Sequence, residues 1–457
     1  MNSVLELLVK AGNFVSNIGS MVMIPVILVI VGLFFRISLP KAIRSGLLVG
    51  AGFVGLNLVT GLLTSNIGVA AKLLFERFHL NLKFVDGGWA AAAGIAYSTE
   101  VGALIIPVIL AVNILLLFLH LTRTVNIDIW NFWHFAFAGS MVMVLTGSMF
   151  YGFLAAIAYC VFSLRLADYI AKNMQDVLGM EGITITESAA IATAPIAMVM
   201  DKIYDHIPVL KDAKGDVRAL NRKMGALGEP VVIGFVLGIV LGAVCSYGFR
   251  ETVELGINLG AVMLMMPRMV KVIMEGLLPI SEAAREFMQK RFSGEEYYIG
   301  LDSALACGHE NCVAISVLII PFYILFAIIT PGNQTLPFGA LAGTVFAGCI
   351  TNGIHRGNFV RTYLTCIIQT VIGLYIGTLI GPLFTQLAKS IGYQFPEGAT
   401  GITYYCPGGW AYSTIIYSMK YKMIGVVIVA VLLVGWYYIT REKSADRKYR
   451  FMTATRK

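Results

Sequence analysis

Charged residues are scarce in this sequence. Asp, Glu, Lys and Arg make up 13% of its 457 residues, whereas soluble domains contain about 25%. Hydrophobic residues make up 58%, and this figure does not include the 47 glycines. These proportions exclude a water-soluble enzyme, a disordered chain and a nucleic-acid-binding protein. They predict an all-α polytopic membrane protein that contacts lipid.

Cysteine is also scarce and has no regular spacing. The seven cysteines are an odd number and lie mostly inside apolar runs, so no disulfide framework is expected. No cleavable signal peptide is expected, because the first long apolar run, residues 18–35, is followed by Arg36 and not by a small-residue cleavage site. The net charge of +8 reflects mainly the cytoplasmic loops of a membrane protein and is poor evidence for an acidic partner.

Long apolar runs are frequent, and a membrane-spanning helix needs about 20 mostly apolar residues. The residues from 130 to 164 are too many for one helix, so we divide them at the turn-prone sequence Thr146-Gly147-Ser148. The sequence then predicts eleven crossings, at 18–35, 46–63, 101–119, 131–146, 150–164, 231–248, 255–270, 313–329, 338–353, 363–388 and 424–440.

Charge in the connecting segments predicts the orientation. If the N-terminus is outside, the inner segments carry net charges of +3, +3, +2 and +5, in the order 36–44, 202–223, 354–361 and 441–457. The main outer segments sum to zero, and Lys420 and Lys422 are the outer exceptions. Because cytoplasmic loops are enriched in Lys and Arg, we expect the N-terminus outside and the C-terminus in the cytoplasm.

Short sequences recur at about half the chain length. Gly-Ile-Thr occurs at 182–184 and 219 residues later at 401–403, and Ile-Ile-Pro occurs at 105–107 and 214 residues later at 319–321. Similar offsets indicate a duplication. Five crossings per half would make the halves inverted, as in many transporters, with the substrate between them. We predict a first repeat, a second repeat, and a last helix with a basic tail, at residues 1–225, 226–422 and 423–457.

Four stretches at membrane depth do not resemble ordinary spanning helices, because Gly, Pro, Ser, Thr or charged residues interrupt them. They are residues 86–100, 182–200, 301–312 and 401–420. Irregular backbone is tolerated in a bilayer only against protein or a water-filled cavity. We expect re-entrant hairpins or broken helices that line a cavity. The alternative is that some are surface helices on the membrane face.

These stretches and the helix at 131–146 hold the polar groups that would bind a polyol or sugar. Such a solute needs carboxylates, amides or His for its hydroxyls and an aromatic ring for its carbon face. Trp89 and His134 also have structural alternatives, as an interfacial aromatic and a satisfied core histidine. The predicted substrate-binding residues are Asp86, Trp89, His134, Glu187, Ser188, Asp302, His309, Glu310 and Asn311.

Other polar residues have simpler interpretations. Two cysteines flank His309 and Glu310, but Cys307 and Cys312 lack a familiar zinc spacing, so we expect neither a metal nor another cofactor. The residues before the helix at about 130 are expected to cap it (Asp128 and Asn131) or to lie in an interfacial belt (Trp130 and Trp133).

The chain resembles the membrane component, enzyme IIC, of the bacterial galactitol-type phosphotransferase systems, and is similar to the related ascorbate-type branch. The resemblance extends from about residue 52 to 358. The stretches that carry the resemblance are residues 125–131, 228–230, 266–268, 300–302 with 308–309, 331–334 with 336–339, and 355–358. The chain departs from the galactitol pattern at 90–94, at Thr186-Glu187 and at Glu310, which puts galactitol itself in doubt but not a polyol or related sugar.

The resemblance implies a multi-pass protein of the bacterial inner membrane, which binds the polyol outside and carries it inward. A mobile core would slide against a homodimeric scaffold in an elevator mechanism, with both parts drawn from the two repeats. A separate enzyme IIB would transfer a phosphoryl group from its phosphocysteine, after receiving it from enzyme IIA. Enzyme IIC is itself not phosphorylated. The resemblance also places His134 on a substrate-contacting helix.

For the phosphoryl transfer we predict His309 or Glu310 as the base that accepts the hydroxyl proton. The basic residues Arg268, Lys271 and Arg356 are predicted to steer enzyme IIB. Two alternatives remain open at this point. The first is an ion-coupled secondary transporter of a small polar solute, and the second is a membrane enzyme that acts on lipid-linked substrates.

Overall fold

The computed structural model describes residues 20–77, 82–211, 229–291, 297–337, 339–340, 343–393, 395 and 400–454. Most of them are helical. Within this described part, six helices are long and apolar enough to cross a membrane, namely Glu100–Phe118, Ile129–Thr146, Met149–Leu178, Glu310–Ile329, Phe359–Ser390 and Met423–Arg441. The chain therefore has the architecture of an all-α polytopic membrane protein, and six of the predicted crossings coincide with these helices.

The prediction for residues 338–353 is wrong. In place of one helix, its described part contains the 3-10 helix η3 (Thr344–Phe346) and the short helix α18 (Cys349–Ile354). Gly348 separates them and has a φ of 81°, a left-handed conformation that favours glycine and ends a regular helix. An interrupted backbone places polar main-chain groups at membrane depth, which requires protein or a cavity beside it.

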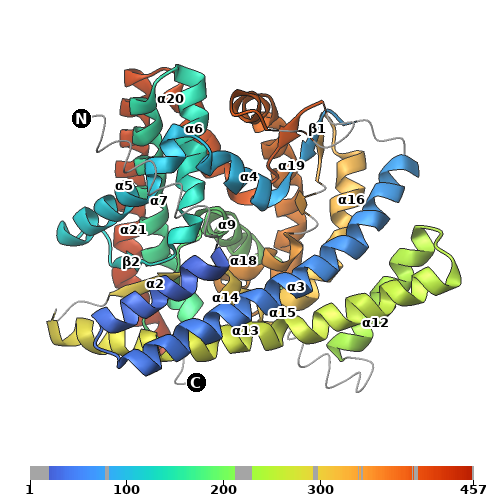
Figure 1. The fold of residues 1–457 in the computed structure, drawn as a ribbon, viewed down its shortest axis with the longest axis horizontal. Coiled ribbons are helices and arrows are strands. Elements are labelled where there is room, and N and C mark those ends of the chain that lie inside the picture. The colour runs from blue at the N-terminus through green and yellow to red at the C-terminus, as the bar shows by residue number, and fades with distance from the viewer. Residues whose placement is uncertain are drawn as a thin grey trace.

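Four helices form a layer along one edge of the molecule (Figure 1). They are α2 (Ser20–Phe34), α3 (Leu39–Arg77), α12 (Pro230–Val244) and α13 (Phe249–Arg291). The long helices α3 and α13 contact each other through small residues, since a Cβ on Gly276 would lie 2.7 Å from the carbonyl oxygen of Ser45. Small residues at a crossing let two backbones approach closely, which gives tight helix packing in lipid.

The remaining helices form a bundle beside this layer (Figure 1). Helix α6 (Trp133–Thr146) ends at Gly147, whose φ of 70° forms the C-cap, and α7 (Met149–Leu178) begins two residues later. The predicted division at 146–148 is confirmed. The two helices pack closely, because a Cβ on Gly139 would lie 2.8 Å from the carbonyl oxygen of Gly152.

Other helices of the bundle come from both halves of the chain. The first half contributes α4 (Gly88–Tyr97), α5 (Glu100–Phe118), η1 (Ile129–Phe132), α8 (Ser188–Ile191), α9 (Ala194–Tyr204) and α10 (Pro208–Lys211). The second half contributes α14 (Ala304–Cys307), α15 (Glu310–Leu318), α16 (Ile320–Ile329), α19 (Phe359–Ser390), η4 (Pro407–Gly409), α20 (Trp410–Met419) and α21 (Met423–Ala454).

Two small parallel sheets join the halves. The first has the strand order β5-β1-β6 (Thr335–Leu336, Phe84–Asp86, Ile402–Thr403), and the second has the order β2-β4-β3 (Thr124–Asn126, Tyr298–Leu301, Ile183–Ile185). Each sheet takes its middle strand from one half of the chain and both edge strands from the other. Strands β1, β3, β4 and β6 each lead into short helices, so the four stretches predicted to be irregular do have interrupted backbone.

Candidate functional site

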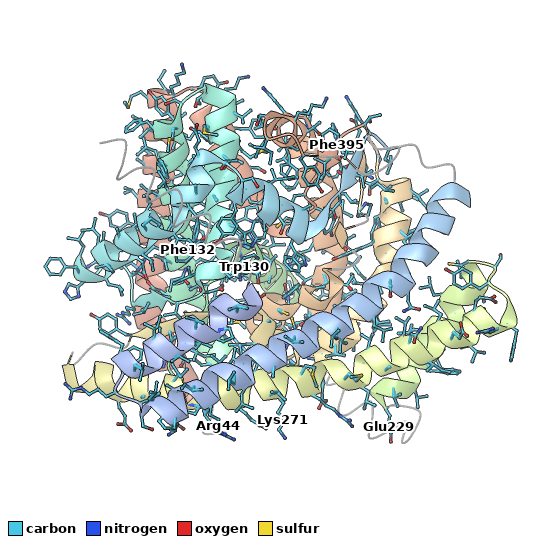
Figure 2. The ribbon with its side chains drawn as sticks, viewed as in Figure 1. Arg44, Trp130, Phe132, Glu229, Lys271 and Phe395 are labelled. Carbon is cyan, nitrogen blue, oxygen red and sulfur yellow. The ribbon has the colours of Figure 1, made fainter. Side chains whose placement is uncertain are left out.

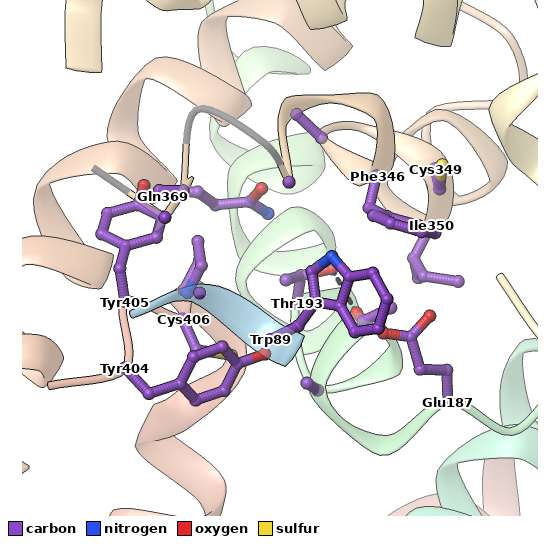
Figure 3. Close-up of a pocket in the computed structure, with 18 of the residues that line it drawn as sticks. Trp89, Glu187, Thr193, Phe346, Cys349, Ile350, Gln369, Tyr404, Tyr405 and Cys406 are labelled. Atoms are coloured by element: carbon purple, nitrogen blue, oxygen red, sulfur yellow. Dashed lines mark hydrogen bonds between the residues drawn. The ribbon is translucent and has the colours of Figure 1, made fainter. Parts of the chain in front are cut away.

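A cavity of about 170 Å³ lies where the strands end and the short helices begin (Figure 3). This volume is more than ten times the roughly 10–15 Å³ that one water molecule needs, so the cavity has room for a small solute. Its polar and aromatic lining consists of Asp86, Glu187, Asp302, Asn131, Gln369, Thr193, Trp89, Trp130, Trp133, Tyr323, Phe346, Tyr404 and Tyr405, with Cys349, Cys366 and Cys406.

Asp86 is the last residue of β1, and the sheet positions its carboxylate. Its Oδ1 accepts hydrogen bonds from the backbone N–H groups of Gly88 and Tyr405, both at 3.0 Å. Its Oδ2 is buried and has no hydrogen-bond partner among the described residues. Gly88 has a φ of 72°, and a Cβ there would lie 3.2 Å from Gly339, so this turn requires glycine. One carboxylate oxygen is therefore held in place by two backbone N–H groups, and the other has no partner among the described residues.

Asp302 follows β4 and is held in a similar way. Its Oδ1 accepts a hydrogen bond from the backbone N–H of Ala304 at 2.8 Å, and its Oδ2 accepts one from Asn131 Nδ2 at 3.0 Å. The same Nδ2 donates to both carboxylate oxygens of Asp128, at 3.1 and 2.9 Å. Asp128 precedes η1 without a side-chain capping bond, so the predicted capping role of its carboxylate is wrong. Asn131 instead lies between two carboxylates.

Glu187 comes from the segment between β3 and α8. Its Oε2 accepts a hydrogen bond from Ser303 Oγ, and its Oε1 lies 4.0 Å from Nε2 of His134. The His134 ring is 1% exposed and stacks on Trp133 with 3.7 Å between ring centroids. Its Nδ1 lies 3.0 Å from the carbonyl oxygen of Asn131, and its Nε2 has no hydrogen-bond partner in the part of the chain that the structure describes. His134 thus lies behind Trp133, beside Glu187.

Aromatic rings form the walls of the cavity. Figure 3 shows Trp89 between Glu187 and Tyr404, and Figure 2 shows Trp130 toward the middle of the molecule. Trp133 is only 2% exposed, so its predicted place in an interfacial belt is wrong, because its ring packs against His134 and Tyr404 inside the bundle. Flat rings beside carboxylates suit a solute with both C–H faces and hydroxyl groups.

The structure brings together four of the predicted site residues as cavity lining, namely Asp86, Trp89, Glu187 and Asp302. His134 lies directly behind this lining. The other four, Ser188, His309, Glu310 and Asn311, are not among the described residues that line the cavity.

Those four residues have other positions. Ser188 is buried at the start of α8. His309 caps α15, because its Nδ1 accepts a hydrogen bond from the backbone N–H of Asn311 at 3.2 Å, and Glu310 is the first residue of that helix. The Asn311 amide donates at 2.9 Å to Asn352 and at 2.7 Å to the carbonyl oxygen of Gly357.

The second wall of the cavity is formed by Tyr404, Tyr405 and Cys406 after β6 and by Tyr323 and Gln369. Residues 401–420 were expected to line a cavity, but none of these five residues was predicted from the sequence as a site residue. A signal for the first three residues was present. They follow the Gly-Ile-Thr sequence at 401–403, which repeats the one that precedes Glu187. Residues at corresponding places after the two strands therefore line the same cavity. Tyr323 and Gln369 lie in apolar helices and had no such signal.

The charge of the lining restricts the ligand. Three acidic side chains line the cavity, and among its described lining residues none is Lys, Arg or His. The described residues also contain no group of three or more His, Cys, Asp or Glu side chains that could hold a metal ion. Carboxylates accept hydrogen bonds and repel anions, so the cavity suits an uncharged polyhydroxyl compound rather than a sugar phosphate or a carboxylic acid.

A carboxylate- and aromatic-lined cavity inside a bundle of membrane-crossing helices is typical of a membrane protein that binds a small polar solute. The family model described as "PTS system sugar-specific permease component" matches residues 13–398. The chain belongs to this family, the galactitol-type enzyme IIC permeases of the phosphotransferase system. A permease of this system takes a sugar-type substrate and works with a cytoplasmic enzyme IIB.

Two relatives from Escherichia coli strain K12 have similar sequences. The chain is 39% identical over 419 residues to a "Putative permease IIC component". The aligned residues make up 91% of this chain and 95% of the relative. The chain is 38% identical over 380 residues to the "PTS system galactitol-specific EIIC component", covering 83% of this chain and 84% of the relative. The similarity therefore extends over most of each protein.

Proposed function

We propose that this protein carries galactitol or a related polyol inward across the bacterial inner membrane, and that enzyme IIB phosphorylates the solute during transport. The observation that carries the proposal is a cavity lined by aromatic rings and three carboxylates, with no cation among its described lining residues. Hydroxyl groups donate to carboxylates, and the C–H faces of a polyol pack on aromatic rings. The galactitol-specific relative supports the same substrate class.

Asp86 and Asp302 are proposed to bind hydroxyl groups at opposite ends of the solute. They lie 216 positions apart, and in each the Oδ1 atom accepts the backbone N–H of the residue two positions later. Two corresponding carboxylates, one from each sheet, suit a chain with hydroxyl groups along its whole length. Trp89 and Tyr404 are proposed to cover its carbon atoms.

Glu187 is proposed as the base that accepts the hydroxyl proton during phosphoryl transfer. It lines the cavity, and the ring nitrogen of His134 lies 4.0 Å behind it. The sequence prediction placed this role on His309 or Glu310, whose positions at the start of α15 are less favourable. Comparing Glu187→Gln with Glu310→Gln decides between these positions. The variant of the true base loses formation of the phosphorylated polyol while it still binds the polyol.

We also propose that the chain consists of two inverted repeats, residues 1–225 and 226–422, followed by the last helix. The recurrence of the six strands supports this proposal. Strands β1, β2 and β3 are followed by β4, β5 and β6 at offsets of 214, 211 and 219 residues, and the two sheets exchange strands between halves. The boundary at 225 lies outside the described residues.

The same proposal includes an elevator movement of the bundle against the layer of α2, α3, α12 and α13, which would form a homodimeric scaffold. Exposed apolar side chains on α12, among them Val236, Val240 and Val244, suit contact with lipid or a second copy. With the N-terminus outside and the C-terminus in the cytoplasm, exposed Lys271 on α13 (Figure 2) and Arg356 would face enzyme IIB.

Transport assays test the proposed function. Uptake of the polyol into membrane vesicles should require phosphoenolpyruvate, enzyme IIA and enzyme IIB, and should continue in the presence of an uncoupler. Uptake that proceeds without the phosphoryl donor and stops on addition of an uncoupler would show an ion-coupled secondary transporter instead. A panel of hexitols and pentitols, compared by thermal stabilisation of the purified protein, identifies the preferred solute.

A further inference from the structure

A second polar network lies in the bundle, outside the cavity, and connects the two halves of the chain. Asp201 on α9 accepts hydrogen bonds from His355, at 3.0 Å, and from Arg361, at 2.7 Å. The other ring nitrogen of His355 lies 2.9 Å from Thr365 Oγ1, and that hydroxyl donates to Tyr204 on α9 at 3.2 Å. Two residues of the first half are thereby joined to three of the second.

The two basic residues of the network are buried, whereas the Asp201 side chain is 24% exposed and the Asp205 side chain is 56% exposed. His355 is 3% exposed and Arg361 is 8% exposed. Arg361 also bonds Asp205 at 2.9 Å and donates to the backbone carbonyl oxygens of Leu210 and Lys211 at 3.1 and 3.4 Å. Charge-assisted hydrogen bonds of this kind are about twice as strong as neutral ones. These four contacts of Arg361 thus tie the end of α9 and the segment after it to the start of α19.

Each helix that carries the network also reaches the cavity. Thr193 lines the cavity immediately before α9, Cys349 lines it at the start of α18, and Cys366 lines it on α19 next to Thr365. An α-helix rises about 1.5 Å per residue, so the network residues lie within about one to three helical turns of the lining. Gln369, another lining residue, bonds Thr351 on α18. The network therefore joins three helices that also form part of the cavity wall.

We propose that Asp201, His355 and Arg361 form a latch that closes the cytoplasmic end of the solute pathway and must open before solute or product leaves. The inference rests on the proposed transport function and orientation, because segments 202–223 and 354–361 are the predicted inner segments. Opening requires only that α9 separates from α18 and α19. That movement breaks the contacts of Asp201 and Tyr204 with the second half and leaves the hydrogen bonds within each helix intact.

The three cavity thiols provide the test. Inside-out vesicles that contain the full-length protein are treated with a membrane-impermeant methanethiosulfonate, and mass spectrometry measures modification of Cys349, Cys366 and Cys406. Arg361→Gln and Asp201→Asn should each be modified at least about tenfold faster than the wild type, because loss of a charge-assisted bond shifts the closed–open equilibrium. Arg250→Gln is the matched control, since it breaks the exposed pair with Glu254 on α13.

Unchanged modification rates in both folded latch variants would overturn the proposal. Thr365→Val provides a second variant if the charge variants do not fold, because it removes one hydroxyl and leaves every charge paired. It should also speed modification, and an unchanged rate would count equally against the latch. The labelling uses no polyol, so it is separable from the proposed function. A failure of polyols to stabilise the protein would reject the proposed solute. Latch variants that bind the polyol but are labelled no faster than the wild type would reject the latch.

Discussion

Replacing Asp86 by Asn tests the proposed polyol contact with little effect on the fold. Oδ1 of an asparagine at this position can still accept both backbone hydrogen bonds, from Gly88 and Tyr405, so the turn after β1 and its contact with β6 are retained. The change falls on Oδ2, which has no partner within the described residues and belongs to a side chain that lines the cavity. An amide nitrogen would replace the oxygen that is proposed to accept a polyol hydroxyl.

The magnitude follows from the kind of bond that is lost. A hydrogen bond to a charged group contributes about 1.5–3 kcal/mol net, which corresponds to roughly 10- to 150-fold in affinity at about 1.4 kcal/mol per tenfold. The new amide can donate to a hydroxyl oxygen and recover part of this energy. The expected loss of polyol affinity for Asp86→Asn is therefore about tenfold, near the lower limit.

Isothermal titration of the purified protein with the preferred hexitol measures this loss. The melting temperature without ligand should change little, because the substitution is isosteric and both Oδ1 bonds remain. Glu254→Gln is the control, since it makes the same carboxylate-to-amide change on the exposed surface of α13. Unchanged affinity in a folded Asp86→Asn protein would refute the contact and shift the hydroxyl-binding role to Glu187 and Asp302.

Three further predictions concern other parts of the site and the latch. Glu187→Gln should reduce formation of phosphorylated polyol, measured with enzyme IIB, more than it reduces thermal stabilisation by the polyol; equal losses would reject its role as the base. Trp89→Ala should weaken polyol affinity by about two- to tenfold in titrations, whereas Trp89→Phe should retain most of it. Burial raises the pKa of Asp201, but hydrogen bonds from His355 and Arg361 outweigh this effect and lower it below its usual value. The resulting stabilisation is present above the carboxyl's ordinary pKa and is lost as pH falls through the lowered value. The wild type should therefore melt at a higher temperature than Asp201→Asn near neutral pH, and the difference should shrink below about pH 4.

Hydropathy predicted the membrane class and the helices with continuous apolar runs. The division between α6 and α7 was also predictable, because Gly147 adopts the left-handed conformation that ends a helix. Residues 338–353 show why hydropathy fails elsewhere. That run is apolar enough for a span, but Gly348 and the two short helices around it are stabilised by contacts with the rest of the bundle. Hydropathy reports how apolar the side chains of a segment are. It does not report which groups form hydrogen bonds with the backbone N–H and C=O of that segment.

The site was only partly predictable for a related reason. Asp86, Glu187 and Asp302 were recognisable because a carboxylate in an otherwise apolar region has a large desolvation cost and therefore indicates a function. Tyr323, Gln369 and Tyr405 cost little to bury in a helix or after a strand, so nothing in the sequence separates them from core residues. His309 shows that a polar residue at membrane depth can also satisfy a helix terminus.

The exchange of strands between the halves connects the fold to the proposed mechanism. Asp86 is held by Tyr405 of the other half, and Asp302 is held by Asn131 of the other half. A solute that binds both carboxylates therefore contacts both halves at one end of the pathway, while the latch of Asp201 and Arg361 joins the same halves at the other end. Separation of α9 from α18 and α19 would alter the latch and the part of the cavity wall that these helices carry. Solute binding and latch opening would then be coupled through the rigid helices that carry both sites.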